Sequence, residues 1–546
     1  LKWRRFIGGP SDSGPPSGSK VVFARPEVAG IEIWSKNSTL GRRGPGWSIG
    51  CCRIGTDHFF ITLRGKAERG SARSRIAKVE PSPRAMSDFV LRTRLNHAVA
   101  DVFAWHMRPG ALERLIPPWE SVTIKIREGT PATGGRVTFR VRRGAAEITF
   151  EVRHTDFEPD HLFRDEQVRG PFTRWVHTHR FEPDDGGGCV VEDHVDWELP
   201  MGATGRLLGG SSVEVELERL FTFRHRRLGD DLDRIKRHGD EAPLAVGVTG
   251  SSGLIGRTLC NVLTTGGHRV VRVVRNLKTR KSEDALWDPI EGTVEQERLE
   301  GLDAVVHLAG EPLLGLRWTE EKKKRIWASR IEGTEHIARA LARLRRPPRV
   351  LVSASAVGFY GNRGDQRLSE DSKPGKGFLA KLCQAWEAAT SPAARMGIRV
   401  AHLRIGLTLT PSGGALGTMI LPFKVGIGGR IGSGRQYVSW IDHDDLLSLI
   451  LHVIQTPSIR GAVNATAPYA VPNSTFTGTL GRVLDRPTFL PLPALALKAL
   501  LGEMGKEMLL QGQRVQPTVA EKTGFEFMYP GLEESLRHQL GRATSP

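Results

Sequence analysis

The sequence of 546 residues contains no apolar run long enough to cross a membrane as a helix, because such a span needs roughly 18 or more uninterrupted apolar residues. Cysteine is also scarce, and its spacing fits neither a disulfide framework nor a zinc site. The five cysteines are Cys51, Cys52, Cys189, Cys260 and Cys383. These absences argue against a helical membrane protein and against a disulfide-stapled secreted domain. We therefore predict a cytoplasmic protein without a membrane span.

Acidic residues are in deficit, but the deficit is uneven along the chain. The whole sequence has 78 Lys and Arg against 60 Asp and Glu, a net charge of +18. Residues 1–85 hold 16 of these basic residues and only 6 of the acidic ones, and the rest of the chain holds 62 and 54. A strongly basic protein can be a nucleic-acid binder. Because more than half of the excess lies in the first 85 residues, we predict no nucleic-acid partner.

Residues 1–85 also lack methionine and any helical or strand periodicity. The first methionine is Met86, and a regular strand pattern follows it at once. We expect residues 1–85 to be upstream sequence translated from a wrongly placed start. A disordered basic tail and a targeting segment are the alternatives, although no apolar signal-peptide core with a small-residue cleavage site is visible.

The length is too great for a single hydrophobic core, and it suggests two or more domains. With 39% apolar and 25% charged residues, the composition is that of an ordinary globular protein. We predict five segments: the basic leader (1–85), a small α+β domain (86–238), a linker (239–243), a nucleotide-binding α/β domain (244–480) and a C-terminal domain (481–541).

The small domain has a simple predicted order of elements. Residues 89–95 alternate as a half-buried strand, and two short helices between residues 98 and 115 are interrupted at Pro109 and Gly110. Six further strands are predicted at 121–127, 136–143, 146–154, 161–169, 173–181 and 190–199. A long helix, about 212–238, closes the domain, and its predicted apolar face consists of Val215, Leu217, Leu220 and Phe221.

This order, with runs such as the strand at 172–181, resembles the START-like family, also called SRPBCC or polyketide-cyclase/coenzyme-Q-binding-like. The resemblance implies an α+β helix-grip fold, in which the last helix lies across a curved sheet and encloses an apolar cavity for a small hydrophobic or lipid-like ligand. The alternative is that these apolar faces simply fill a core. Trp175, His177, His179 and Phe181 share one strand face, but the sequence offers no partner cluster, so we predict no metal site.

A glycine-rich turn lies at the start of the larger domain. Residues 249–256 read Thr-Gly-Ser-Ser-Gly-Leu-Ile-Gly, between an apolar run at 244–248 and a helical pattern at 257–263. Gly250 allows a tight turn, Gly253 lets phosphates approach the backbone, and Gly256 lets helix and strand pack closely. The helix N-terminus offers free N–H groups to a diphosphate. The predicted dinucleotide contacts are Thr249, Gly250, Ser252, Gly253, Leu254, Ile255 and Gly256.

Acidic residues are absent between Arg257 and Ser282. An NAD enzyme places an Asp or Glu about 20 residues beyond the glycines to hold the ribose 2′-hydroxyl. Here the next predicted strand, 268–275, ends at Arg275, which can pair with a 2′-phosphate. We therefore predict NADP as the cofactor, with NAD as the alternative. A solvated arginine at a strand end is the other interpretation of Arg275.

Strands and helices continue to alternate, with strands at 304–308, 350–354 and 400–404 and helices at 320–344 and 378–395. This pattern predicts a doubly wound, Rossmann-like parallel sheet. Ligands of such sheets bind at the carboxyl edge of the strands. The candidates at that edge are Leu308, Ala309, Gly310, Ser353 and Ser355, with Arg330 and Arg404 as further polar candidates near the cofactor.

The motifs TGSSGLIG, DAVVHLAGEPL, WASRIEGT, SASAVGFYG, FLAKLCQAWE, SWIDHDDL and VNATAP together resemble the atypical short-chain dehydrogenase/reductases of the epimerase family, which is NAD-dependent epimerase/dehydratase-like. The tail, from RPTFLPLPALALKALLGEM to GFEFMYPGLEESL, resembles the C-terminal domain of unknown function of that group. The resemblance implies that Ser355 hydrogen-bonds the substrate oxygen. It also places Lys424, Gln436 and Trp440 in the segment that covers the substrate.

The Tyr-x-x-x-Lys pair of that family does not transfer to this sequence. Counting back from Glu387, Leu379 (or Phe378) stands in place of the tyrosine, and Cys383 in place of the lysine. These side chains cannot relay a proton. Tyr360 is the nearest substitute donor, although a tyrosine in a turn is more often structural. Two functions follow: an NADP(H)-dependent oxidoreductase or epimerase-like enzyme acting on a hydrophobic carbonyl or alcohol, or an NADP-binding sensor or ligand carrier without catalysis.

Overall fold

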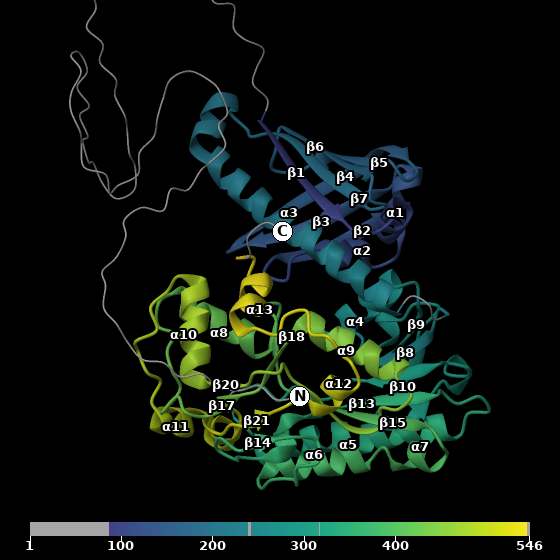
Figure 1. Cartoon of the computed structure of the whole chain (residues 1–546), viewed down its shortest axis with the longest axis vertical. Helices are drawn as coiled ribbons and strands as arrows, with labels where there is room; N and C mark the ends of the chain where they lie inside the picture. The colour runs from purple at the N-terminus through teal and green to yellow at the C-terminus, as the bar shows by residue number, and fades with distance from the viewer. Residues whose placement is uncertain (1–86, 239–241, 316, 543–546) are drawn as a thin grey trace, which may run out of the picture. The chain divides into compact units, whose positions relative to one another are not determined.

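The computed structural model describes residues 87–238, 242–315 and 317–542. The predicted basic leader therefore lies outside the described residues, as does most of the predicted linker. Residues 84–546 form one compact unit, which contains a seven-stranded sheet and an eight-stranded sheet. The elements of both are labelled in Figure 1. The domain boundaries given above stay predictions.

The first sheet is antiparallel, in the order β1-β7-β6-β5-β4-β3-β2. Its strands are β1 (Ser87–Leu95), β2 (Ser121–Glu128), β3 (Arg136–Arg143), β4 (Ala146–Glu158), β5 (Leu162–Arg169), β6 (Arg174–Pro183) and β7 (Cys189–Glu198). Two short helices, α1 (Val99–Met107) and α2 (Ala111–Leu115), connect β1 to β2. Burial alternates along β1 and β7, because one face of the sheet packs on the core. The predicted order of elements is confirmed.

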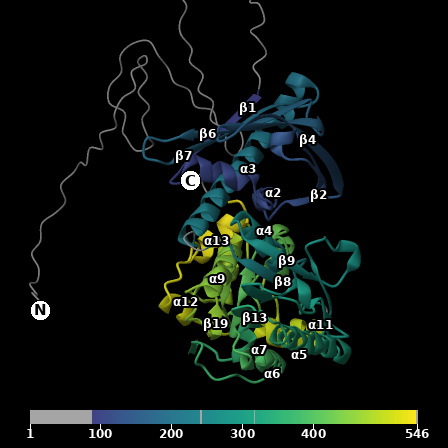
Figure 2. The same ribbon diagram turned by 90° about the vertical axis from the view of Figure 1, so that its right-hand side faces the viewer.

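The long helix α3 (Gly202–His238) lies across one face of this sheet (Figure 1 and Figure 2). The predicted start, near residue 212, was too late. Each glycine disfavours a helix by about 1 kcal/mol, so the glycine-rich stretch 202–210 gave no local helical signal. Val215 was also assigned wrongly, because it is 62% exposed. Val213 packs beneath the helix with Leu217 and Phe221 instead, since residues four apart share a helix face.

The second sheet has the order β11-β10-β9-β8-β12-β13-β15-β19. Its strands are β8 (Ala245–Thr249), β9 (Arg269–Val274), β10 (Ala285–Asp288), β11 (Thr293–Val294), β12 (Ala304–His307), β13 (Val350–Ala356), β15 (Arg399–Ile405) and β19 (Gly461–Ala465). All pairs are parallel except β10 with β11. Strand order reverses beside β8, as in a doubly wound sheet.

Helices cover both faces of this sheet. Val306 of β12 packs on one face with α4 (Leu254–Thr265) and α9 (His443–Gln455), whereas its neighbour Val305 packs on the other face with α5 (Glu320–Ala342) and α7 (Ser391–Arg395). The predicted helix 378–395 is in fact α6 (Phe378–Ala388) followed by α7. Pro392 near the start of α7 lacks an N–H group, so it cannot continue the hydrogen-bonding of α6. The Rossmann-like prediction is confirmed.

The remaining elements extend the carboxyl edge of the second sheet. The strands are β14 (Arg367–Leu368), β16 (Leu407–Leu409), β17 (Tyr437–Val438), β18 (Trp440–Asp442), β20 (Val471–Pro472) and β21 (Arg514–Val515). The helices are α8 (Gly414–Lys424), α10 (Asn473–Leu484), α11 (Ala494–Gly505), α12 (Thr518–Lys522) and α13 (Leu532–Gln539). None of the described helices is both long enough and apolar enough to cross a membrane.

Buried ion pairs connect two helices of the antiparallel-sheet half, α2 and α3, with α9 of the parallel-sheet half. Asp444 of α9 has no exposed surface and pairs with Arg114 of α2 (Oδ1 to Nη2, 3.1 Å) and with Arg227 of α3. Burial opposes the charged form, but these two guanidinium groups hold the pKa of Asp444 well below its usual range. Removing one partner of such a pair is costly, so the cluster fixes α2 and α3 against α9.

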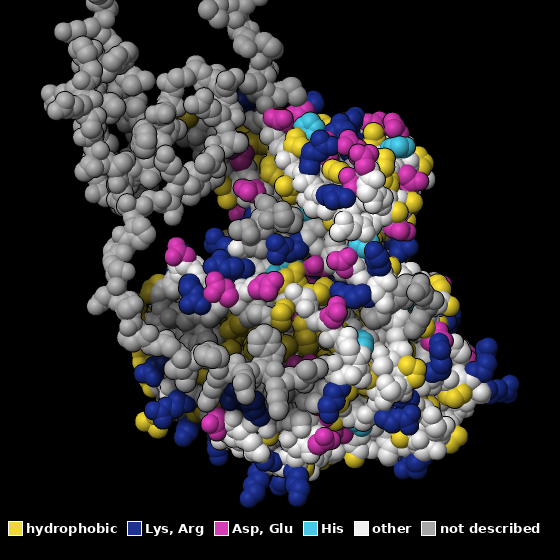
Figure 3. All heavy atoms as spheres, in the orientation of Figure 1, with side chains coloured by type: hydrophobic (Ala, Val, Ile, Leu, Met, Phe, Trp, Pro, Cys, Tyr) yellow, Lys and Arg dark blue, Asp and Glu magenta, His cyan; other side chains and the backbone are white. Residues whose placement is uncertain are grey.

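Surface charge is mixed on the face drawn in Figure 3, where Lys and Arg side chains are interspersed with Asp and Glu over the part of the chain that the structure describes. A mixed surface gives no broad positive field for phosphate backbones. The absence of a nucleic-acid partner stays a prediction.

Candidate cofactor and active site

The glycine-rich turn connects β8 to α4 as predicted, and two of its glycines are required by packing. Gly250 has a φ of +65°, and a Cβ there would lie 2.8 Å from the carbonyl carbon of Leu308. A Cβ at Gly256 would lie 2.3 Å from the Gly250 oxygen. Both contacts are shorter than van der Waals distances, so these positions exclude side chains. Gly250 and Gly256 therefore shape the turn.

Gly253 differs from the other two glycines. It is exposed, and a Cβ there would approach only the Gly250 oxygen, at 3.1 Å. Gly253 is also the N-cap of α4, and no side chain caps this helix. The first-turn N–H groups of a helix have no partner within the helix, and they form a natural anion site with the helix dipole. The turn therefore fits the diphosphate of a dinucleotide.

Thr249 supports the turn from inside the sheet. Its side chain is fully buried, and its Oγ1 accepts hydrogen bonds from the amides of Leu308 (3.1 Å) and Ala309 (3.3 Å). Its own hydroxyl is 2.8 Å from His307 Nδ1. Burial lowers the pKa of His307 to about 4, so the neutral ring can accept the hydroxyl proton. Thr249 thus holds the loop after β12 against the glycine turn, and its role is positional.

Arg275 directly follows β9 and is exposed. Because β9 pairs in parallel with β8, Arg275 lies at the same sheet edge as the glycine turn. Among the described residues it forms no ion pair, whereas Arg272 of the same strand is bound to Asp284 (Nε to Oδ1, 2.8 Å). An uncommitted guanidinium at this edge is suited to a phosphate.

Arg330 of α5 also lies where the sequence predicted, beside the loop after β12. Its guanidinium carbon is 3.3 Å from the position of a Cβ on Gly310, and its Nη1 donates to the Glu311 carbonyl at 2.9 Å. The group stacks on Trp386, 4.9 Å from the ring centroid, and burial lowers the pKa of Arg330 to about 10. Arg330 is held rigidly at the cofactor edge.

Ser355 lies at the carboxyl end of β13, and its hydroxyl donates a 2.7 Å hydrogen bond to Glu387 Oε1. The same carboxylate forms a bidentate pair with Arg404, with two N–O distances of 2.9 Å. Ser355 and Arg404 are 3% and 5% exposed. The predicted cofactor ligand Arg404 is therefore committed to a protein carboxylate.

Tyr360 extends this network. Its hydroxyl donates to Asn464 Oδ1 (2.6 Å) and accepts from Arg404 Nη1 (2.9 Å). The side chain has no exposed surface, and burial raises its pKa. A proton donor must reach the substrate within hydrogen-bonding distance. These contacts favour a structural role for Tyr360 over proton transfer.

The positions of the missing tyrosine and lysine are apolar in the fold. Leu379 packs against Gly358, and Cys383 is 1% exposed beside Ser355. Burial raises the pKa of the Cys383 thiol to about 12, so the thiol is neutral at physiological pH. It cannot replace a lysine ammonium group.

The three predicted substrate contacts have different environments. Lys424, at the end of α8, is exposed. The Gln436 side-chain amide donates to the carbonyls of Ile431 and Leu509, both at 3.0 Å. Trp440 is fully buried and donates to the Tyr469 carbonyl at 3.0 Å. These contacts favour a core role for Trp440, whereas Gln436 is half-buried and Lys424 is exposed.

A cavity of about 750 Å³ lies between the seven-stranded sheet and α3. Most of its wall is apolar or aromatic, and the large side chains include Phe139, Phe150, Trp175, Leu217 and Leu220. The volume is within the range of small-molecule sites, about 300–1,000 Å³. The apolar faces of this half therefore enclose a space as well as forming a core.

Comparison with known proteins identifies three regions of the chain. The model of the NAD dependent epimerase/dehydratase family matches residues 246–465, that of polyketide cyclase / dehydrase and lipid transport matches 95–232, and a domain of unknown function (DUF1731) matches 492–539. An epimerase family protein of Mycobacterium tuberculosis is 42% identical over 301 residues, which are 55% of this chain and 99% of that protein. The chain belongs to the epimerase family.

Two solved structures are also similar to this chain. A nucleoside-diphosphate sugar epimerase from Corynebacterium glutamicum is 31% identical with a TM-score of 0.70, over 84% of this chain and 91% of that chain. The human epimerase family protein SDR39U1, solved with NADPH, is 34% identical with a TM-score of 0.51, over 55% and 99%. The resemblances stated from the motifs, including the cyclase-like N-terminal half, are confirmed.

Glu387 of this epimerase family protein was not among the predicted site residues. It served only as the position from which the places of the missing tyrosine and lysine were counted. Leu379, Cys383 and Glu387 are spaced by four in α6, so they share one helix face, and that face meets the end of β13. The spacing was a usable signal for a carboxylate beside Ser355. Arg404 was a sequence candidate for the cofactor, but its pairing with Glu387 gave no signal, because the two residues lie on different elements.

Proposed function

We propose that this chain is an NADP(H)-dependent oxidoreductase that acts on a hydrophobic carbonyl or alcohol, and that its START-like half holds an apolar ligand. The main support is the anion site at Gly253 together with the uncommitted Arg275 on the next strand. The glycine turn would hold the diphosphate, and Arg275 the 2′-phosphate. When bound, the cofactor supplies the hydride.

The preference for NADP over NAD rests on charge. No carboxylate between Arg257 and Ser282 competes for the ribose, and a human relative is solved with NADPH. A charge-assisted hydrogen bond to a phosphate contributes about 1.5–3 kcal/mol. Loss of one such contact therefore corresponds to about a 10- to 100-fold change in affinity.

Arg275→Asp tests this preference. We expect the affinity for NADPH to fall about 10- to 100-fold, because the carboxylate repels the 2′-phosphate, and the affinity for NADH to stay equal or rise. Isothermal titration calorimetry with both cofactors measures the ratio. The matched control is Arg269→Asp, an exposed arginine at the opposite end of β9, which should leave both affinities unchanged. Equal NADPH affinity in Arg275→Asp and Arg269→Asp would contradict the assignment.

The chain's own contribution at the reacting centre would be Ser355. Its hydroxyl is held by Glu387, and a turn of χ1 would present the O–H to a substrate oxygen while Glu387 stays paired with Arg404. Both oxygens of the Glu387 carboxylate accept hydrogen bonds from Arg404. In this proposal Ser355 polarises the carbonyl, no side chain replaces the missing tyrosine, and the alkoxide formed by hydride transfer takes its proton from solvent water.

Ser355→Ala is the activity test. With a panel of hydrophobic carbonyls, we expect turnover of NADPH to fall by about 100-fold or more, while NADPH affinity stays within about threefold because the serine does not contact the phosphates. Absorbance of NADPH follows the reaction. Unchanged turnover in Ser355→Ala would remove the serine from the mechanism.

A second candidate function is an NADP-binding sensor or ligand carrier without catalysis. The observation that favours it is that the hydroxyl groups of both candidates, Ser355 and Tyr360, already donate hydrogen bonds to protein side chains. In that case the wild-type protein binds NADPH tightly and transfers hydride to no member of the panel. Any turnover that depends on Ser355 favours the first candidate.

A further inference from the structure

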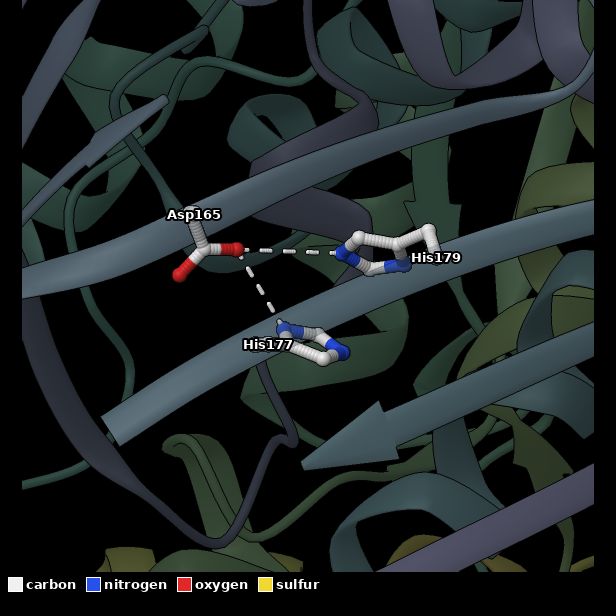
Figure 4. Close-up of side chains that lie close together, drawn as sticks. All are labelled: Asp165, His177 and His179. Carbon is white, nitrogen blue, oxygen red and sulfur yellow. Dashed lines mark ion pairs between the residues drawn. The ribbon is translucent and has the colours of Figure 1, made fainter. Parts of the chain in front are cut away.

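Three buried side chains gather at the wall of the START-like cavity (Figure 4). Asp165 comes from β5, and His177 and His179 from β6. Asp165 Oδ2 lies 3.3 Å from His177 Nδ1 and 3.9 Å from His179 Nε2. One ligand atom from each residue falls within 4.8 Å of the other two. Asp165 and His177 are register partners in the sheet, so the pairing of β5 with β6 creates the cluster.

A fourth residue, Asp193 of β7, hydrogen-bonds the ring of His177 and lies close to the ring of His179. Its Oδ1 lies 2.8 Å from His177 Nε2 and 2.6 Å from His179 Nδ1. Each histidine therefore turns one nitrogen to Asp193 and the other toward Asp165. Metal-binding histidines almost always engage a carboxylate or carbonyl through the ring nitrogen that does not bind the metal. This shared carboxylate is an independent indication that the other two nitrogens are arranged for a common ligand.

Asp193 is itself fixed from the far side. Its Oδ2 is bonded to His225 Nε2 of α3 at 2.6 Å, and His225 Nδ1 is 2.8 Å from Thr93 Oγ1 of β1. Three strands and the long helix thus hold one carboxylate in place. A site supported in this way keeps its geometry when a ligand binds.

Burial and access fit a bound cation. Asp165, His177 and His179 are 8%, 4% and 7% exposed, yet all three line the cavity of about 750 Å³. The other titratable groups nearest to them on the cavity wall are His106, His154 and Arg224. Two buried carboxylates are costly unless positive charge compensates them, and one divalent ion would balance Asp165 and Asp193. The cavity leaves space beside the three ligand atoms.

The two separations that involve Asp165 agree with a transition-metal ion, and the third, between the two imidazole nitrogens, is within 4.8 Å. Zinc binds histidine nitrogen and carboxylate oxygen at about 2.0–2.2 Å, which places tetrahedral ligand atoms about 3.4 Å apart. The 3.3 Å distance between Asp165 and His177 is close to this value. The 3.9 Å distance between Asp165 and His179 would reach it after a side-chain shift of under about 1 Å. Two imidazoles and one carboxylate suit zinc, iron, cobalt, nickel or copper better than calcium or magnesium.

We propose that Asp165, His177 and His179 bind one divalent transition-metal ion, with Asp193 as the positioning residue, and that its open coordination positions face the apolar cavity. An ion in this place would coordinate an oxygen atom at the polar end of an otherwise apolar ligand. The site lies in the other half of the chain from the dinucleotide turn, so this inference does not depend on the proposed NADP chemistry.

The test uses the full chain, freed of metal by dialysis against a chelator and then titrated with Co²⁺ as the probe. We expect one equivalent to bind with the visible d–d bands of a low-coordinate histidine site. His179→Gln should weaken binding by about 100-fold and remove these bands, since one of three ligands is lost. His194→Gln is the matched control, because His194 follows Asp193 on β7, so its side chain points to the opposite face of the sheet, and this variant should bind Co²⁺ as the wild type does.

Asp193→Asn provides a second variant in case His179→Gln folds poorly. Loss of the second carboxylate should weaken Co²⁺ binding about 10- to 100-fold without removing a ligand. Circular dichroism and thermal unfolding, measured in parallel, report whether each variant is folded. The proposal is overturned if the wild type binds no Co²⁺, or if His179→Gln and Asp193→Asn bind it as tightly as the wild type. The cluster would then be a proton-sharing histidine–carboxylate network.

Discussion

Gly253→Asp is expected to abolish NADPH binding while leaving the protein folded. Gly253 is the exposed N-cap of α4 with φ −74° and ψ 176°, a conformation that aspartate adopts readily, and its carboxylate would accept hydrogen bonds from the free N–H groups of the first turn. The carboxylate therefore occupies the anion site. We expect NADPH affinity to fall by about 100-fold or more, and stability to stay equal or rise by a few tenths of a kcal/mol.

Calorimetry and thermal unfolding measure the two effects together. Gly253→Asn is the matched control, because asparagine has the same shape and caps a helix equally well without the negative charge. Both variants tolerate the 3.1 Å contact with the Gly250 oxygen by a small shift. NADPH affinity should therefore fall further with Asp than with Asn. If Gly253→Asp binds NADPH like the wild type, the diphosphate does not lie on this helix.

Glu387→Leu is expected to cost about 3–5 kcal/mol in the free energy of unfolding. The substitution leaves Arg404, which is 5% exposed, without its carboxylate and removes the acceptor for Ser355. Arg404→Leu should cost a similar amount for the reciprocal reason. The double variant should lose less than the sum of the two, since replacing both members of a buried pair by apolar residues leaves no unpaired charge.

Urea unfolding of the wild type, both single variants and the double variant gives the coupling energy. The comparison is the pair Arg349–Asp303, with side chains 73% and 32% exposed, for which Arg349→Ala should change stability by less than about 1 kcal/mol. Additive losses for Glu387 and Arg404 would show that the two residues act independently, against the geometry described here.

The site could be predicted from the sequence where the signal was local. The glycine turn carries its own conformational reasons, since Gly250 needs positive φ and Gly256 needs the space of a missing Cβ. Arg275, which directly follows β9, was also visible from a few neighbouring residues. The same holds for Leu379 and Cys383, which stand where the family has tyrosine and lysine. The fold class followed from the same kind of evidence, because helical and strand periodicities are properties of neighbouring residues.

The interpretation of single side chains was weaker where it depended on the far side of the fold. Tyr360 and Trp440 were candidates for contact with substrate, but distant segments that contribute Asn464 and Tyr469 bury and bond them. His177 and His179 were visible as a pair on one strand, but Asp165 and Asp193, on two other strands, had no local connection to them. The sequence showed no partner Cys/His cluster, and the fold brings a carboxylate to the two histidines instead; the absence of a metal stays a prediction.

The sequence by itself determined the order of helices and strands, the dinucleotide turn, the positive end of β9 and the loss of the acid–base pair, because backbone conformation and the spacing of short motifs depend on adjacent residues. Only the tertiary structure decided that Glu387 pairs with Arg404 and that Asp165 and Asp193 flank two histidines beside a cavity. Strand register and helix packing bring together residues that are distant in the chain, and those neighbours set the charge, burial and hydrogen bonding on which chemistry depends.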